Sequence, residues 1–181
     1  KDSVLVEKML MNKQNFKSAK DVDGFVPQAS GLYCIRIKNV HLLPEPFGTI
    51  LLERGHDILY IGIASENLYN RFLNQELRAK GHGTFFRSMG AVLGYKPPKG
   101  SLIEKRNKKN YKFSKTDELK IIGWINENLM VNWVESAGDL DSLETSLIVK
   151  YLPLLNLSKN PAALQILSYL RKECVEIANR N

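Results

Sequence analysis

The segments Gly31-Leu-Tyr-Cys-Ile-Arg-Ile37 and Ile58-Leu-Tyr-Ile-Gly-Ile63 decide the fold of this chain. Both have the length of a strand and are rich in β-branched and aromatic residues, which favours β-structure. The connection between them, residues 38–57, is long and contains several prolines and glycines. The simplest topology is therefore an antiparallel pair of strands joined by an unusually long loop, within which residues 49–53 can form a short helix.

Helical patterns follow the second strand and continue toward the C-terminus. Ser65 is a suitable N-cap for a helix with a buried apolar face. A different, polar stripe of that helix contains Asn67, Arg71, Gln75 and Arg78. Further helices are predicted over residues 84–93, 116–128 and 141–151 and from Asn160-Pro161 onward, with a third strand over residues 130–134. The predicted fold class is α+β, with a small central antiparallel sheet of about three strands flanked by helices.

Composition limits the classes of protein to which the chain can belong. Its 181 residues are 44% hydrophobic and 25% charged, which is typical of one globular domain and excludes a disordered chain. No segment approaches the ~18 consecutive apolar residues of a membrane span, and residues 1–20 lack the apolar core of a signal peptide. The two cysteines are too few for a disulfide scaffold or a cysteine-based zinc site. We expect a cytoplasmic protein with no membrane partner.

The net charge of +7 is concentrated in one basic segment, residues 96–115. Tyr111 and Phe113 interleave with its lysines, so the segment could follow a phosphate backbone and stack on bases. The alternative is a solvated loop whose lysines keep the protein soluble.

Candidate catalytic residues remain after the common motifs are excluded. The sequence has no glycine-rich nucleotide loop, and none of its three histidines has a nearby histidine or cysteine that would favour zinc. What remains is Tyr33 and Tyr60 on the paired strands, Arg71 on the next helix and Glu144 on a late helix. Each also has a structural reading: strand tyrosines usually pack, a single arginine usually lies on the surface, and Glu144 lies at a boundary if residues 143, 147 and 154 form the buried stripe. A carboxylate directed at the core would cost several kcal/mol unless it were paired or bound a cation.

Taken together, these residues resemble the GIY-YIG nuclease superfamily. Gly31-Leu-Tyr33 and Tyr60-Ile-Gly62 look like its paired signature, and residues 66–72 resemble its next motif, a helix that bears an essential arginine. Leu143-Glu144 and residues 153–156 look like its metal-binding glutamate and terminal asparagine. The resemblance implies three antiparallel strands flanked by helices, and metal-dependent hydrolysis of a DNA phosphodiester. It divides the chain into an N-terminal extension (residues 1–30), a nuclease-like domain (31–156) and a C-terminal helix packed on the same domain (157–181).

The resemblance also implies a role for each matching residue. Glu144 holds one divalent cation, Mg²⁺ or Mn²⁺, and Arg71 contacts the scissile phosphate. Tyr33 and Tyr60 line the site near the attacking water, and Asn156 shapes the glutamate side of the pocket. A free phenol has a pKa of about 10. We expect the cation and Arg71 to lower the pKa of Tyr33 so that it can act as the general base.

The sequence departs from the family pattern in three ways. The two tripeptides are separated by the long connection described above. Ile63 stands where many members have a lysine after the second tripeptide, and Gln75 stands where others have a histidine one helical turn after the arginine. The second cationic or proton-transferring group is therefore unassigned. His82, which lies between two glycines, is the substitute candidate and is otherwise a loop histidine.

We expect nucleic-acid contacts from polar and cationic side chains near the site and in the basic segment. These residues are Arg71, Gln75, Arg78, Arg87, Lys105, Arg106, Lys108 and Lys109. The leading hypothesis is a DNA endonuclease. The alternative is a non-catalytic nucleic-acid-binding module with the same fold, and a protein-interaction domain is a third, weaker reading.

Overall fold

The computed structural model describes residues 3–181, which contain a four-stranded antiparallel sheet with the strand order β1-β4-β2-β3. The central strand β2 (Gly31–Ile37) lies between β4 (Leu129–Glu135) and β3 (Ile58–Ala64). The predicted antiparallel pair, the third strand and the α+β class are confirmed. The fourth strand, β1 (Lys17–Ser18), was not predicted, because two residues carry no detectable alternation.

The register places both tyrosines on one face of the sheet. Tyr33 lies opposite Gly62, and Tyr60 lies opposite Ile35. Residues that face each other across antiparallel strands share a side of the sheet, and so do residues two apart on one strand. Tyr33 and Tyr60 are therefore diagonal neighbours on the same side.

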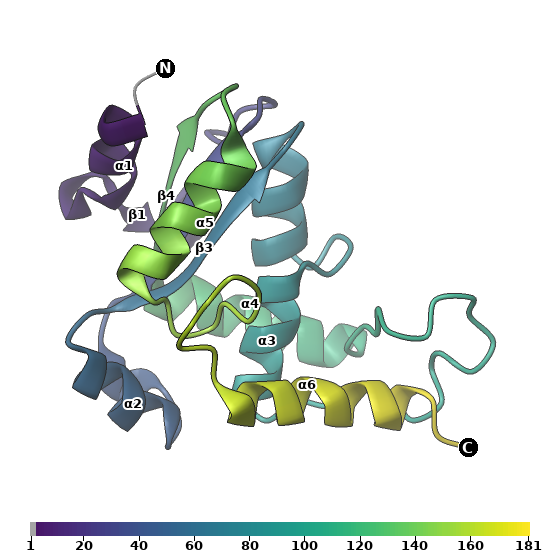
Figure 1. Ribbon diagram of the computed structural model, residues 1–181. Coiled ribbons are helices and arrows are strands. Elements are labelled where there is room, and N and C mark those ends of the chain that lie inside the picture. The colour runs from purple at the N-terminus through teal and green to yellow at the C-terminus, as the bar shows by residue number, and fades with distance from the viewer. Residues whose placement is uncertain (1–2) are drawn as a thin grey trace.

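Helices cover both faces of this sheet (Figure 1). α1 (Ser3–Met11) and α5 (Leu140–Tyr151) pack on one face, against side chains that include Leu32, Cys34 and Ile61. No helix among residues 3–181 has both the length and the apolarity needed to cross a membrane.

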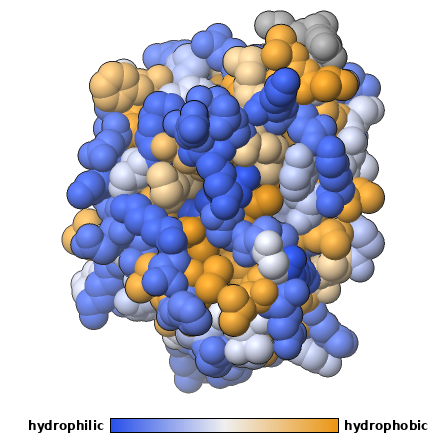
Figure 2. Space-filling model, turned by 90° about the vertical axis from the view of Figure 1, so that its left-hand side faces the viewer, coloured by the Kyte–Doolittle hydropathy of each residue, from blue (hydrophilic) through white to orange (hydrophobic). Residues whose placement is uncertain are grey.

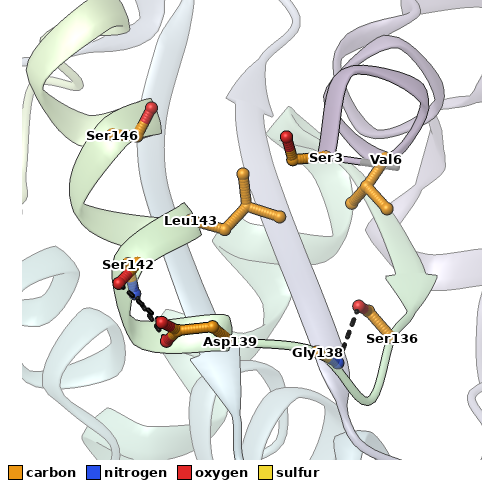
Figure 3. A pocket seen from close by; sticks show the side chains of 8 residues that line it. All are labelled: Ser3, Val6, Ser136, Gly138, Asp139, Ser142, Leu143 and Ser146. Carbon is orange, nitrogen blue, oxygen red and sulfur yellow. Dashed lines mark hydrogen bonds between the residues drawn. The ribbon is translucent and has the colours of Figure 1, made fainter. Parts of the chain in front are cut away.

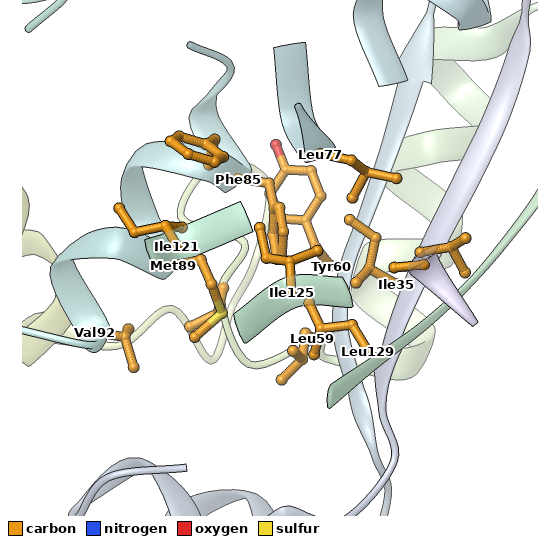
Figure 4. Close-up of a cluster of buried hydrophobic side chains, with 14 of the residues drawn as sticks. Ile35, Leu59, Tyr60, Leu77, Phe85, Met89, Val92, Ile121, Ile125 and Leu129 are labelled. Atoms are coloured by element: carbon orange, nitrogen blue, oxygen red, sulfur yellow. The ribbon is translucent and has the colours of Figure 1, made fainter. Parts of the chain in front are cut away.

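The opposite face, which carries the tyrosines, holds the larger core (Figure 4). A π-helix (Tyr69–Leu77), α3 (Thr84–Val92) and α4 (Lys115–Asn128) supply its other side. α6 (Gln165–Ala178) packs against α3. The long connection between β2 and β3 contains α2 (Phe47–Arg54), which is slightly longer than the predicted helix.

The helix after β3 differs from the prediction in its type and its start. It is a π-helix, whose hydrogen bonds join residue i to residue i+5. One turn after Arg71 therefore comes Glu76, which is buried, and not Gln75, which is half-buried. Asn67, rather than Ser65, caps the first turn by accepting a hydrogen bond from a backbone N–H over 3.1 Å. None of the four residues of the predicted polar stripe is buried, and the predicted apolar face is buried, but the wider turn adds the carboxylate of Glu76 to that buried face.

Two other predicted helix starts are displaced. Ser114, not Thr116, caps α4 through its hydroxyl oxygen. α6 begins at Gln165, not at Pro161, because the Asn160 side chain accepts a hydrogen bond within a turn instead of capping a helix. At α4 both Ser114 and Thr116 offer a hydroxyl oxygen, whereas α6 begins after Leu164, which supplies no side-chain cap.

A cavity of about 290 Å³ lies between α1 and α5 (Figure 3). It is lined largely by serines, and its acidic residue, Asp139, caps α5 by accepting a hydrogen bond from the Ser142 N–H. The left-hand side of the molecule in Figure 1 is mostly hydrophilic, with apolar side chains gathered at the lower centre of that face (Figure 2). Neither tyrosine, Arg71 nor Glu144 lines this cavity, so we assign no chemistry to it.

Candidate active site

Tyr33 and Glu76 form a buried pair on the face of the sheet that carries both tyrosines. The Tyr33 hydroxyl donates a hydrogen bond to Glu76 Oε2 over 2.8 Å, and both residues are 0% exposed. Burial, and then the charge of Glu76, raises the pKa of Tyr33 well above its usual value. The direction is opposite to the lowering expected from the sequence, because burial and the Glu76 carboxylate together outweigh the opposing charge of Arg71.

The glycines of the two tripeptides allow close packing around Tyr33. A Cβ atom at Gly62 would lie 2.4 Å from Tyr33 Cζ and 2.5 Å from its hydroxyl oxygen. A Cβ atom at Gly31 would lie 2.2 Å from the carbonyl oxygen of Val134 on the neighbouring strand. The Tyr33 ring also stacks on Phe72, with ring centroids 4.7 Å apart. These contacts determine where the Tyr33 hydroxyl lies.

Arg71 is the solvent-exposed cation beside this pair. Burial of part of the side chain opposes its charge, but Tyr33 and Glu76 outweigh that effect, so the pKa of Arg71 is raised. An arginine that reaches solvent and remains charged is suited to binding phosphate oxygens.

Tyr60 lies next to Tyr33, with ring centroids 6.3 Å apart, and is 7% exposed. Its ring packs among apolar side chains of the larger core (Figure 4). Burial, together with the charges of Glu76 and Glu144, raises the pKa of Tyr60. Both phenols are therefore un-ionised near neutral pH.

Glu144 lies at the edge of the buried stripe of α5, which Leu147 and Ile148 form. Its side chain is 14% exposed, and Oε1 accepts a hydrogen bond from Lys159 Nζ over 2.9 Å. Lys159 also pairs with Asp141 over 2.6 Å. Glu144 therefore lies at the boundary of the buried stripe, as one of the two interpretations of the sequence expected. The Lys159 ammonium lies against its carboxylate.

Asn156 satisfies the open edge of β3. Its Oδ1 accepts from the Ile61 N–H over 3.0 Å, and its Nδ2 donates to the Ile61 carbonyl over 2.9 Å. Leu154 and Leu155 donate backbone hydrogen bonds to the same strand. Asn156 therefore holds the chain after α5 against β3, close to the second tripeptide.

Two further arginines lie near the buried pair, Arg87 on α3 and Arg171 on α6. Arg87 is largely buried, and its Nε donates to the Tyr111 carbonyl over 2.8 Å. Arg171 donates to Ser88 Oγ over 2.8 Å, and its charge acts on both Arg87 and Tyr60. Their positions provide positive charge near the site in a chain that lacks the lysine after the second tripeptide.

His82 lies in the core rather than at the surface of the site. Its ring packs against Phe86 and Phe113, and Nε2 accepts a hydrogen bond from the Phe113 N–H over 3.2 Å. Burial, and then the nearby Arg87, lowers the pKa of His82 to about 3. The ring is neutral at physiological pH, so it supplies no second cation.

Arg78 is tied to the N-terminal segment. Its guanidinium donates to the Asp23 carboxylate, to Asn126 Oδ1 and to the backbone carbonyls of Ala19 and Leu77. All five of its N–H groups are thereby engaged. Arg78 holds the π-helix against residues 19–23 and α4.

The basic segment projects beyond the C-terminal end of α6 (Figure 1). Lys105, Arg106 and Lys109 are exposed. The Lys108 ammonium donates to two backbone carbonyls of its own loop, including that of Leu102 over 3.1 Å. Three of the four cations predicted to contact nucleic acid in this loop are thus exposed and can bind phosphate groups. Lys108 also stabilises the loop through its hydrogen bonds.

The interleaved aromatic residues of this segment belong to the core. Tyr111 is 0% exposed and Phe113 is 3% exposed, and their rings contact each other edge to face. The prediction that these rings stack on nucleic-acid bases is therefore wrong, because both rings are buried. The alternation of lysines and aromatic residues places the lysines outward and the rings inward.

The residues around Glu144 fit a magnesium-type cation. No three His, Cys, Asp or Glu side chains among residues 3–181 form a group that could hold a metal ion. Mg²⁺ commonly binds through one or two carboxylates and completes its shell with water and substrate phosphate oxygens. The Glu144 side chain is partly exposed, and its carboxylate already has a positively charged partner in the Lys159 ammonium. Glu144 alone is therefore the candidate carboxylate ligand for such an ion.

Comparison with known proteins agrees with this arrangement. The sequence model of the GIY-YIG catalytic domain matches residues 31–173. The chain belongs to this family, whose members are generally endonucleases acting on nucleic acid. No curated protein and no solved structure gives a match to the chain.

Sequence reasoning missed Glu76 and Arg171, although both left a signal. Glu76 lies among the apolar residues Phe72, Leu73 and Leu77, and Arg171 lies between Leu167 and Cys174 on the buried stripe of α6. A charged residue on an apolar stripe is a candidate for a buried, paired charge. Neither stripe identifies the partner, which comes from another element.

Proposed function

We propose that the chain is a metal-dependent DNA endonuclease that hydrolyses a phosphodiester bond with one divalent cation on Glu144. The proposal is carried by one observation: Tyr60 on β3 lies beside Tyr33 on β2, with ring centroids 6.3 Å apart, and the charges of Arg71 and Glu144, from two further elements, act on Tyr60. Family membership and the excess of basic residues support a nucleic-acid substrate.

Each side chain has a role that suits its position. Arg71 binds a non-bridging oxygen of the scissile phosphate, where its charge stabilises the transition state. Glu144 holds Mg²⁺ or Mn²⁺, which would neutralise charge on the phosphoryl and leaving oxygens. Tyr33 is the base for the attacking water, a role that requires the phenol to give up its own proton in the same step, and Tyr60 packs beside it to define the pocket. Because Arg71 interacts with the Tyr33 hydroxyl, its movement onto a phosphate would uncover that hydroxyl.

Three residues keep a supporting part in this proposal. Asn156 holds β3 and the following chain in place, and Arg87 adds positive charge near the phosphate. His82 receives no catalytic step, because its ring is buried and neutral.

Substitution of the site residues tests the proposal. Glu144→Gln and Arg71→Ala should each lower the rate of DNA cleavage with Mg²⁺ by at least about 10²-fold, because each removes one charge from the transition state. Glu7→Gln is the matched control, since Glu7 also pairs with a lysine, Lys150, over 2.6 Å, but on α1. Normal cleavage by Glu144→Gln and Arg71→Ala, measured on purified folded variants, would refute the assignment.

A binding module without turnover is the second candidate, and one observation favours it. The Tyr33 residue is fully buried, so its hydroxyl is closed to water in this structure. A panel of duplex, nicked, branched and single-stranded DNA and RNA, each with Mg²⁺ and with Mn²⁺, separates the two candidates. Tight binding without cleavage of any member would favour the binding module.

A further inference from the structure

Glu76 is a fully buried carboxylate that the mechanism above leaves without a role. An ionised carboxylate in this position costs several kcal/mol unless it is paired and hydrogen-bonded. Its place on the tyrosine side depends on the π-helix, whose turn sets Glu76 in register with Arg71. The charge faces Tyr33 from β2, Tyr60 from β3, Arg71 from its own helix and Arg87 from α3.

One oxygen of Glu76 has a structural explanation. Oε1 accepts a hydrogen bond from the Phe86 N–H over 3.2 Å, in the first turn of α3. The N-cap of α3 is Gly83, which has no side chain, and a Cβ atom there would lie 2.1 Å from Glu76 Oε1. Glu76 therefore caps α3 in place of a local side chain.

The other oxygen is not explained by capping. Oε2 is the atom that accepts the hydrogen bond of the Tyr33 hydroxyl. The phenol proposed as the base thus already directs its own proton at a carboxylate sealed from solvent.

We propose that Glu76 is the final proton acceptor for water attack, acting through Tyr33. This inference rests on the proposed endonuclease function. As the water oxygen forms its bond to phosphorus, one water O–H bond breaks and that proton binds Tyr33 Oη. At the same time the Tyr33 O–H bond breaks and its proton binds Glu76 Oε2. The bond from phosphorus to the leaving ester oxygen breaks, and that oxygen takes a proton from solvent.

A relay of this kind removes the difficulty of a phenol with a raised pKa. Burial and the Glu76 charge oppose a free Tyr33 phenolate. In the relay Tyr33 loses one proton as it gains another, so it never carries a full negative charge. Burial also raises the pKa of Glu76, which makes it a stronger base than a solvent-exposed carboxylate.

Glu76→Gln is the informative substitution, because it separates the two functions of the side chain. The glutamine oxygen can still accept from the Phe86 N–H and cap α3, whereas the amide nitrogen cannot accept a proton from Tyr33. We expect kcat/KM at pH 7.5 to fall by about 10²-fold or more. Wild-type kcat/KM should reach a plateau once Glu76 is ionised, while that of the variant should keep rising about tenfold per pH unit in the alkaline range. A loss that is the same at every pH would assign Glu76 to capping alone and overturn the relay.

A double-substitution cycle provides a second test. In a Tyr33→Phe background, Glu76→Gln should cause no further loss of cleavage, because the relay is already broken. A second loss that multiplies the first would overturn the inference.

Carbon-13 NMR of labelled glutamate carboxyl groups gives a readout that does not depend on cleavage. One carboxyl should titrate above the usual value of about 4.3 and disappear in Glu76→Gln. Its pKa should rise further in Tyr33→Phe, because the hydrogen bond from Tyr33 lowers it. An unchanged titration in Tyr33→Phe overturns the coupling. If the wild type shows this coupling but cleaves no substrate, the endonuclease function is overturned and the relay with it. If the wild type cleaves DNA and the loss in Glu76→Gln is the same at every pH, the relay alone is overturned.

Discussion

Replacement of Gly62 by alanine tests the geometry of the site most directly. Gly62 does not have a positive φ angle, so the backbone itself tolerates alanine. The new Cβ would lie 2.4 Å from Tyr33 Cζ, whereas carbon atoms in contact prefer about 3.5–4.0 Å. The Tyr33 ring must therefore move by about 1 Å. A displacement of that size stretches the 2.8 Å hydrogen bond to Glu76 beyond a normal length.

The expected loss of stability follows from these two effects. Overpacking of a buried site costs about 1–3 kcal/mol. Loss of a hydrogen bond to a charged group costs about 1.5–3 kcal/mol. We therefore expect Gly62→Ala to lower the free energy of unfolding by about 4 kcal/mol. A displacement of about 1 Å in a catalytic group can also reduce cleavage by about 10²-fold.

Urea unfolding followed by circular dichroism, and single-turnover cleavage of DNA, measure the two effects. Gly123→Ala is the matched control, because a Cβ atom at Gly123 in α4 meets nothing within 4 Å. This control should be as stable as the wild type or up to about 1 kcal/mol more stable, with normal cleavage. If Gly62→Ala unfolds within about 0.5 kcal/mol of the wild type and cleaves DNA normally, the argument from close packing is refuted.

Three further predictions concern charge. Burial lowers the pKa of His82 to about 3, so the ring stays neutral in the folded protein, whereas the unfolded chain protonates it below about 6.5. The contribution of His82 to the free energy of unfolding is therefore complete above about pH 6.5. As the pH falls toward 3, that contribution is lost at up to about 1.4 kcal/mol per pH unit. Urea unfolding at pH 7 and pH 5 should show a smaller loss in His82→Gln than in the wild type, and equal losses would contradict this. Lys159→Ala should tighten Mn²⁺ binding about two- to fivefold by freeing Glu144, as measured by calorimetric titration, and weaker binding would show instead that Lys159 orients the carboxylate. Three exposed cations of the basic segment, Lys105, Arg106 and Lys109, can be replaced together with glutamine. The slope of log DNA affinity against log salt concentration should then fall by about one for each phosphate that is no longer neutralised. An unchanged slope would assign the segment to solubility.

Much of the fold was readable from local patterns. The strands over residues 31–37 and 58–64 and their antiparallel pairing follow from β-branched and aromatic content, and the α+β class follows from the helical spacing around them. The two tripeptides were equally visible, because each is a continuous stretch. The starts of three helices were misplaced: neighbouring side-chain oxygens compete for the cap of the π-helix and of α4, and at α6 the expected cap, Asn160, closes a turn instead.

The charges of the site were less readable. Positions 33, 60, 71 and 144 could be proposed from motif order, but their partners could not. Lys159 meets Glu144 from a loop after α5, and Arg171 reaches the tyrosines from α6. Such pairs join elements whose separation along the chain carries no information about their distance in space.

The apolar, β-branched and aromatic strand segments and the helical spacing around them indicated the class of fold, and four motif elements in the right order indicated the family. Tertiary structure alone decided that Glu76 faces Tyr33, that Tyr111 and Phe113 are buried, and that His82 is neutral. The physical reason is that local spacing assumes an α-helical turn and an average environment. A one-residue change in helical phase turns a side chain by about 100°, and only packing against other elements determines which phase, and which pKa, a residue adopts.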